Sequence, residues 1–326
     1  MIKMYKLIVL KIRIRYRLGI LEFSSLWRGL TGLKVRLVAF DSMGVRSMAT
    51  IVETNDVKIF IDPGASLAPR RYGLPPHPLE LEELSYRLDI IRGELEDSDI
   101  VVISHYHYDH YLYRSEDVDY YRGKILLLKH PGQDINRSQR IRAHVFLKKN
   151  NVLEKAKRIE YADARSFKYG ETTIAFSEPV PHGDDGTPLG YVLMTLVVEG
   201  DERFVHTSDV QGPISDKALN ILLEWKPNEI VLCGPPTYFA GYKVPVEVVE
   251  RGLYNMKRLV EKLDIKRLVV DHHLLRDVDY RLKIKDLVEA ATLKSTIVTT
   301  AAEYMGFNVR QLEAYRKDLW GGSSGQ

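Results

Sequence analysis

One short segment restricts what this chain can be. Three histidines and an aspartate lie within six positions, in the order His105, His107, Asp109 and His110. They follow the apolar run at 100–104, which reads as a β-strand. Alternate residues of an extended chain point the same way, so His105 and His107 can bind one cation while Asp109 and His110 face a second one. Burying these groups without a metal would be costly, because buried polar groups need partners.

Short strands and helices alternate along the rest of the chain. Strands are predicted at 35–40, 47–53, 57–61, 100–104, 124–128, 166–169, 172–177, 191–198, 204–207, 229–233 and 267–270. Helices are predicted at 78–96, 136–150, 215–225 and 245–263, and helix dominates from about residue 280. Strand hairpins followed by βα units occur twice. This order indicates an α+β fold in which two sheets pack face to face with helices outside.

The composition excludes other classes of protein. The 326 residues are 45% hydrophobic and 28% charged, and the single Cys233 excludes both a disulfide framework and a zinc cluster built from cysteines. One cysteine is typical of a reducing compartment, so we expect a cytoplasmic protein. No run approaches about 18 apolar residues, so we expect no stable membrane insertion.

Positive charge is concentrated at the start of the chain. Residues 1–33 contain seven Lys or Arg and one Glu, a net charge of +6, which leaves −3 for the rest because the whole chain carries +3. A slightly acidic body does not support a general nucleic-acid-binding surface. The leader at 1–33 is of uncertain order and is compatible with an added edge strand, a basic segment touching membrane or nucleic acid, or a start codon placed too early. We predict one domain at 34–320 and a disordered tail at 321–326.

The histidine-rich segment resembles the signature of the metallo-β-lactamase superfamily, whose members usually carry two zinc, iron or manganese ions. The resemblance implies the αββα four-layer sandwich of that superfamily. It also implies further ligands at fixed places in chain order, each of which has a match here: Asp62, His182, Asp209 and either His272 or His273. The motif spacing is similar to that of an uncharacterised archaeal branch of predicted hydrolases.

The resemblance also implies a role for each ligand. The ligands of the first ion would be His105, His107 and His182, those of the second Asp109, His110 and His272, with Asp209 bridging. Asp62 is expected to fix a ligand histidine or its loop without binding metal itself. Asp109 and Asp62 are therefore the two carboxylates expected to serve catalysis.

The last ligand stays open between His272 and His273. Phosphodiesterase members of the superfamily tend to place an arginine four residues beyond the ligand, and Arg276 is four beyond His272. This favours His272 and leaves His273 to contact substrate. Asp271, His272 and His273 also resemble the motif of DHH phosphoesterases. That family sets the motif in the first half of its chain after an Asp-x-Asp pair, and neither condition holds here.

Substrate contacts are expected from Arg70, Arg71, His273 and Arg276. Arg70 and Arg71 occupy a proline-rich loop after Asp62, where two guanidiniums could meet a phosphate or carboxylate, or simply be solvated. The basic helix at 136–150 could follow nucleic acid or present an ordinary solvated face.

These features predict a binuclear metal-dependent hydrolase that acts through a metal-bridging hydroxide. Two divalent ions are expected, zinc first, with manganese or iron as alternatives. A phosphodiester or nucleic-acid substrate is favoured by the arginines. An ester, thioester or lactone is the alternative, because the body of the chain is acidic. A non-catalytic scaffold that binds metal or nucleic acid is a further alternative, and a homodimer is compatible with the chain.

Overall fold

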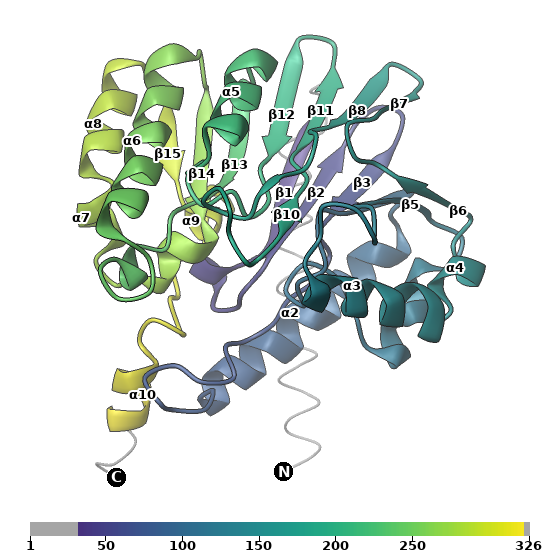
Figure 1. The fold of residues 1–326 in the computed structure, drawn as a ribbon, viewed down its shortest axis with the longest axis horizontal. Coiled ribbons are helices and arrows are strands. Elements are labelled where there is room, and N and C mark those ends of the chain that lie inside the picture. Colours follow the sequence, from purple (N-terminus) through teal and green to yellow (C-terminus); the bar gives the residue numbers. More distant parts are fainter. Residues whose placement is uncertain (1–31, 323–326) are drawn as a thin grey trace. The chain divides into compact units, whose positions relative to one another are not determined.

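The computed structural model describes residues 32–322 (Figure 1). The expected leader falls outside them except for its last two residues, and so do residues 323–326 of the expected tail. Helix α10 (Arg316–Gly322) includes the first two residues of that tail.

Two large sheets contain most of the strands. The first has the order β1 (Lys34–Phe40), β2 (Met48–Glu53), β3 (Lys58–Ile61), β4 (Ile100–Ile103), β5 (Ile125–Leu128), β6 (Arg158–Tyr161). The second has the order β15 (Ile297–Thr299), β14 (Arg267–Asp271), β13 (Glu229–Cys233), β12 (Glu202–His206), β11 (Thr195–Glu199), β8 (Thr172–Phe176), β7 (Ser166–Tyr169). A short ribbon pairs β9 (Val180–Pro181) with β10 (Tyr191–Val192). In each large sheet, the strands that come first in the chain pair antiparallel. Neighbouring strands pair parallel from β3 to β6 in the first sheet and from β12 to β15 in the second.

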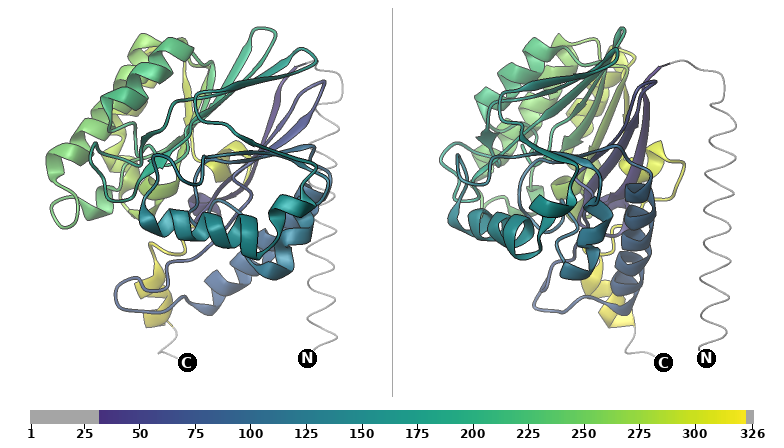
Figure 2. Two further views of the ribbon diagram at one scale, coloured as in Figure 1. Left: turned by 45° about the vertical axis from the view of Figure 1, so that its right-hand side comes forward. Right: turned by 90° about the vertical axis from the view of Figure 1, so that its right-hand side faces the viewer.

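Helices cover the outer face of each sheet (Figures 1 and 2). Beside the first sheet lie α2 (Pro78–Glu96), η2 (Ser115–Tyr121), α3 (Arg137–His144), the π-helical turn η3 (Val145–Lys149) and α4 (Val152–Lys155). Beside the second lie α5 (Asp216–Trp225), α6 (Val246–Lys262), α7 (Tyr280–Lys283) and α8 (Lys285–Leu293). The remaining helical elements are η1 (Asp41–Met43), η4 (Thr237–Phe239), η5 (His272–Arg276) and α9 (Ala301–Tyr304).

Alternation along the strands builds the layers. In β4, Ile100 and Val102 pack in the core between the two sheets, whereas Val101 and Ile103 pack in the core beneath α2. Successive side chains of a strand point to opposite faces, so a strand covered on both sides is apolar throughout. A third core joins the second sheet to α5, α6 and α8. The αββα four-layer sandwich expected from the sequence is confirmed.

Several element boundaries differ from the expectations. The strand predicted at 191–198 is divided into β10 and β11, because the chain changes partner there and Leu193 donates its backbone N–H to the carbonyl of Ser104. The helix predicted at 136–150 continues from α3 into the π-helical turn η3. The strands β6, β9 and β15 were not predicted. Every helix within residues 32–322 is too short or too polar to cross a bilayer.

Candidate metal centre

The candidate site forms where strands of both sheets end. Parallel strands place their carboxyl ends at one edge of a sheet, where α/β folds commonly bind ligands. In the first sheet Asp62 follows β3 and the histidine-rich segment follows β4. In the second, Asp209 lies three residues after β12, and His272 follows β14 directly. His182 follows β9 of the short ribbon.

The first group of side chains comprises His105, His107, His182 and Asp209, whose ligand atoms lie within 4.8 Å of one another. Asp209 Oδ2 is 2.9 Å from His182 Nε2 and 3.8 Å from His105 Nε2. The side-chain nitrogen of Gln211 lies 3.1 Å from His182 Nδ1, on the other side of the ring. This contact directs Nε2 of His182 toward Asp209.

The second group comprises Asp109, His110 and His272. The other oxygen of Asp209, Oδ1, lies 3.4 Å from His110 Nε2 and 3.3 Å from His272 Nε2. Asp109 Oδ2 is 3.9 Å from His272 Nε2. Asp209 therefore faces the first group with one oxygen and the second group with the other.

Asp62 lies beside His110 on the side away from Asp209. Its Oδ2 lies 2.8 Å from His110 Nδ1 and accepts a 2.6 Å hydrogen bond from Ser104 Oγ, while Oδ1 accepts the backbone N–H of Ser104. The ligand atoms of Asp62, His105 and His110 also lie within 4.8 Å of one another. Because both oxygens of Asp62 already have partners, its contacts suit the orientation of a ligand ring better than metal binding.

The backbone around these residues is under strain. The angle φ is positive at Asp62 (51°), Ser208 (53°) and His272 (61°), a region that costs a non-glycine residue about 1–3 kcal/mol. Gly64 is needed because a Cβ there would lie 2.0 Å from the backbone nitrogen of Tyr111. The loop after β3 thus packs directly on the loop after β4, which holds Asp62 against its histidine.

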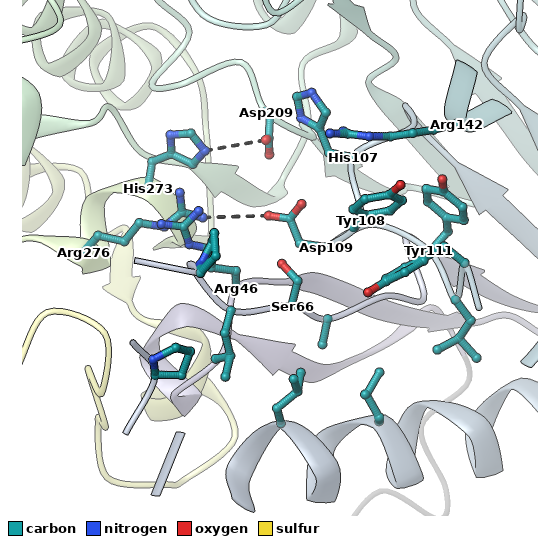
Figure 3. Close-up of a pocket in the computed structure, with 18 of the residues that line it drawn as sticks. Arg46, Ser66, His107, Tyr108, Asp109, Tyr111, Arg142, Asp209, His273 and Arg276 are labelled. Carbon is teal, nitrogen blue, oxygen red and sulfur yellow. Dashed lines mark ion pairs between the residues drawn. The ribbon is translucent and has the colours of Figure 1, made fainter. Parts of the chain in front are cut away.

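Of the two adjacent histidines, His272 is the one that faces both Asp109 and Asp209. Its Nδ1 lies 2.7 Å from Asp41 Oδ2, which turns Nε2 toward these two carboxylates. His273 Nε2 lies 3.6 Å from Asp209 Oδ2 and borders the same groups from the cavity side (Figure 3). Asp209, His272 and His273 also form a group whose ligand atoms lie within 4.8 Å of one another, so the choice of His272 as the ligand stays a prediction.

Asp41 is a site residue that the sequence analysis missed. Besides contacting His272, this buried carboxylate accepts a 2.7 Å hydrogen bond from Arg276 Nε. Arg276 Nη2 in turn lies 4.0 Å from Asp109 Oδ2 (Figure 3). Asp41 follows β1 directly, as Asp62 follows β3, so its place at a strand end was the available signal.

Unpartnered atoms converge on the space between the two groups. His105 Nε2, His110 Nε2, His182 Nε2 and Asp209 Oδ1 are buried and make no hydrogen bond within the described part of the chain. Leaving such atoms without partners is costly, and imidazole and carboxylate donors suit divalent transition metals. The donor set therefore fits a pair of bound cations.

Electrostatics divides the histidines into two kinds. Burial, together with neighbouring imidazoles, lowers the pKa of His105 well below its usual value and that of His107 to about 3. Burial also opposes protonation of His110 and His272, but nearby carboxylates, Asp209 foremost, outweigh it and raise both pKa values, to about 9 for His272. Burial alone would raise the pKa of Asp209, yet the surrounding histidines hold it well below its usual range. Metals bind neutral imidazole. His110 and His272 must therefore each lose a proton when a metal binds, whereas His105 and His107 are already neutral.

A cavity of about 710 Å³ borders both groups (Figure 3). On the side of the histidines it is lined by His107, Asp109, His182, Asp209, His273 and Arg276. Three further arginines, Arg46, Arg114 and Arg142, also reach it. Arg46 forms a two-point ion pair with Glu313 at 2.6 Å. The sequence analysis did not assign Arg46 to the site, since its partner is far away in the chain.

Comparisons with other proteins agree with this geometry. A sequence profile of the metallo-beta-lactamase superfamily matches residues 43–112. A UPF0282 protein of Aeropyrum pernix is 47% identical over 90% of this chain and 100% of its own length. The chain belongs to the UPF0282 family of the metallo-β-lactamase superfamily. Another UPF0282 protein, from Methanocaldococcus jannaschii, is 45% identical over 88% of this chain and 96% of its own.

Solved structures share the fold of this UPF0282 protein. The metallo-beta-lactamase fold protein YhfI from Bacillus subtilis has a TM-score of 0.50 and 16% identity over 82% of this chain and 95% of its own. The diiron beta-hydroxylase CmlA from Streptomyces venezuelae has a TM-score of 0.50 and 12% identity over 83% of this chain and 53% of its own. At such identities the likeness concerns the fold alone.

Two residues expected at the substrate do not reach the cavity of the UPF0282 protein. Arg71 stacks on the Tyr238 ring at 4.4 Å and donates to the backbone carbonyl of Arg276. Arg70 is exposed and donates to the carbonyl of Gly73. Neither arginine is among the residues that line the cavity, although Arg71 contacts Tyr238 and Arg276, which do line it. The expected substrate contacts of Arg70 and Arg71 stay a prediction.

Proposed function

We propose that this protein is a binuclear metal-dependent hydrolase. The observation that carries the proposal is the position of Asp209, whose two oxygens face two groups of histidines. Among the described residues, Nε2 of His105, His110 and His182 is buried without a hydrogen bond, whereas Nε2 of His272 lies 3.3 Å from Arg276 Nη2. The proposed ligands of one ion are His105, His107 and His182, and those of the other are Asp109, His110 and His272, with Asp209 shared. Zinc is the expected metal, with manganese or iron as alternatives.

The residues around the ligands supply orientation and charge. Two bound divalent ions would supply a water acidic enough to attack near neutral pH and would neutralise negative charge in the transition state. Asp62 fixes the ring of His110, and Asp41 fixes that of His272, each through Nδ1. Asp109 lines the cavity, where its carboxylate can accept the proton of the attacking water.

A phosphodiester is the substrate class that the charges favour. Arg276 lines the cavity, and its Nη2 lies 4.0 Å from Asp109 Oδ2. The guanidinium of Arg142 lies over the ring of Tyr108 at 4.4 Å, beside His107 (Figure 3). Among the described residues no carboxylate is within ion-pair distance of Arg142, so its charge is available to an anionic substrate. A carboxylic ester, thioester or lactone is the second candidate, because much of the cavity lining is apolar.

Metal analysis tests the first part of the proposal. Purified protein reconstituted with zinc, manganese or iron should hold close to two equivalents, and Asp209→Ala should lose at least one because the two cations would then repel each other unshielded. Protein that retains no metal after all three reconstitutions would contradict the proposal. Two bound metals without hydrolysis of phosphodiesters, esters or thioesters would instead favour the scaffold alternative.

Arg142 tests the substrate class. Hydrogen bonds to charged groups contribute about 1.5–3 kcal/mol, so Arg142→Gln should weaken turnover of bis(4-nitrophenyl) phosphate about tenfold or more. Turnover of neutral 4-nitrophenyl acetate should change little. Arg140→Gln is the matched control, because Arg140 belongs to the same helix but is exposed and does not line the cavity. Equal losses on both substrates would count against a phosphodiester.

A further inference from the structure

The cavity has two unlike sides. The side described above carries histidines, aspartates and arginines, whereas the opposite wall is formed by apolar side chains of α2 and the neighbouring loops (Figure 3). Leu81, Leu84 and Leu88 all line it. Their spacing of three and four residues places them on one face of α2, pointing the same way. Leu67 and Leu112 extend this apolar wall.

Core packing explains only part of this leucine row. Leu88 is buried and belongs to the core beneath α2, and Leu84 packs against that core. Leu81 belongs to none of the three cores and is 53% exposed, although it faces the cavity. Tyr108 and Leu189, which also line the cavity, are each 40% exposed. An apolar surface that runs continuously from a core to the edge of a reaction site is a binding surface rather than packing.

The arginines on the side of the cavity opposite the leucines indicate the charge of the ligand. Arg46 and Arg276 are each neutralised by a carboxylate, Glu313 and Asp41 respectively, whereas Arg142 has no carboxylate partner within residues 32–322. The volume of about 710 Å³ lies in the range of about 300–1,000 Å³ that holds small molecules. The cavity therefore suits a compact ligand with an anionic end and an apolar end.

We propose that the substrate is a small amphipathic anion, with its hydrolysable group next to Asp209 and its apolar substituent along Leu81 and Leu84. The inference rests on the hydrolase function proposed above and adds the substrate class. If this anion is a phosphodiester, hydrolysis would add water across one of its P–O bonds and release an alcohol and a phosphate monoester. The apolar substituent would stay on the leucine wall, where its removal from water favours binding.

Two phosphodiesters that differ only in their alkyl group test this inference. Methyl 4-nitrophenyl phosphate and octyl 4-nitrophenyl phosphate have the same reacting centre and leaving group. The metal-loaded protein should prefer the octyl ester by about tenfold or more in kcat/KM, since even one methylene in an apolar pocket discriminates by about that factor. Leu81→Ser should reduce the preference several-fold through KM. Leu79→Ser is the matched control, because Leu79 is also exposed on α2 but does not line the cavity.

Binding of inert analogues separates this inference from the hydrolase proposal. Octylphosphonate should bind the metal-loaded protein about tenfold or more tighter than methylphosphonate by calorimetry, and Leu81→Ser should narrow that gap. Equal rates or affinities for octyl and methyl compounds, or equal effects of Leu81→Ser and Leu79→Ser, would overturn the apolar subsite while leaving the hydrolase in place. A retained octyl preference in binding without hydrolysis of either phosphodiester would support the subsite and reject a phosphodiester as the substrate.

Discussion

Asp209 and Asp62 both lie just beyond a strand, but different side chains surround them, so we expect them to have different roles. Asp209 has histidine nitrogens of both groups around its two oxygens. Both oxygens of Asp62 already have partners, which are Ser104 and Nδ1 of His110. At the residue scale, the partners of each carboxylate therefore decide between holding metal and orienting a ligand.

This difference gives a prediction for Asp62→Asn. Loss of a partner that orients a ligand typically costs about 10–100-fold in metal affinity or activity, so this variant should still hold two metals at saturating concentration and turn over more slowly. Metal titration and steady-state kinetics measure the two effects separately. Asp209→Asn is the comparison, and it should lose metal even at saturation. If Asp62→Asn lost its metals as readily as Asp209→Asn, the orienting role would be wrong.

At the element scale, the sequence predicted those elements whose patterns are local. Helix α2 was predicted with both of its bounds, because His77 and Glu80 form a capping box at its start and Pro78 takes the first position. The buried central strands were visible as apolar runs. The strands β6 and β15 were missed because their residues are exposed or half-buried, so no apolar run marks them in the sequence.

For the site too, residues in local sequence patterns could be predicted, whereas residues that depend on distant contacts could not. The candidate ligands were proposed from the resemblance and their order along the chain, and their side chains lie close together in the structure. Asp41 and Arg46 were not assigned, because their importance arises from contacts with residues more than 200 positions away, His272 and Glu313. Arg70 and Arg71 were proposed from their nearness in sequence to Asp62, which does not determine which way a loop directs its side chains, and they bind Gly73 and Tyr238 in the structure.

A buried ion pair joins α10 to the start of α2. Arg316 makes two hydrogen bonds of 2.8 Å to Glu80, and both residues are fully buried. Arg316→Met should destabilise the protein by about 3–5 kcal/mol, because it leaves a buried carboxylate uncompensated. Adding Glu80→Gln should recover part of this loss, since the amide keeps the cap without the charge. Chemical denaturation measures both variants, and an unchanged stability in the single variant would contradict the pairing.

At the scale of the whole molecule, the candidate ligands come from both sides of the sandwich. His105, His107, Asp109 and His110 follow a strand of the first sheet, whereas Asp209 and His272 follow strands of the second. Bound metals would therefore add a further connection between two sheets that already share a core and cross-sheet hydrogen bonds such as His206 to Met48 and Thr172 to Asp56. A ligand of the folded state alone stabilises it by about 2.7 kcal/mol at one hundred times its dissociation constant. Chelation should accordingly lower the Tm of the whole domain.

This stabilisation should depend on pH with a definite sign. In the metal-free protein, Asp209 and Asp41 raise the pKa of the buried His272 from 6.5 to about 9. Protonation of His272 therefore stabilises the folded, metal-free protein. This contribution to the free energy of unfolding is fully present below pH 6.5 and is lost as the pH rises toward 9. Metal must displace this proton and that of His110, so metal affinity should rise over the same window. The difference in Tm between metal-loaded and chelated protein should therefore be larger at pH 8 than at pH 6, as calorimetry can measure. Asp209→Ala, which should lose at least one metal, should show a smaller difference than the wild type at both pH values. A wild-type difference that shrank with rising pH would contradict these ligands.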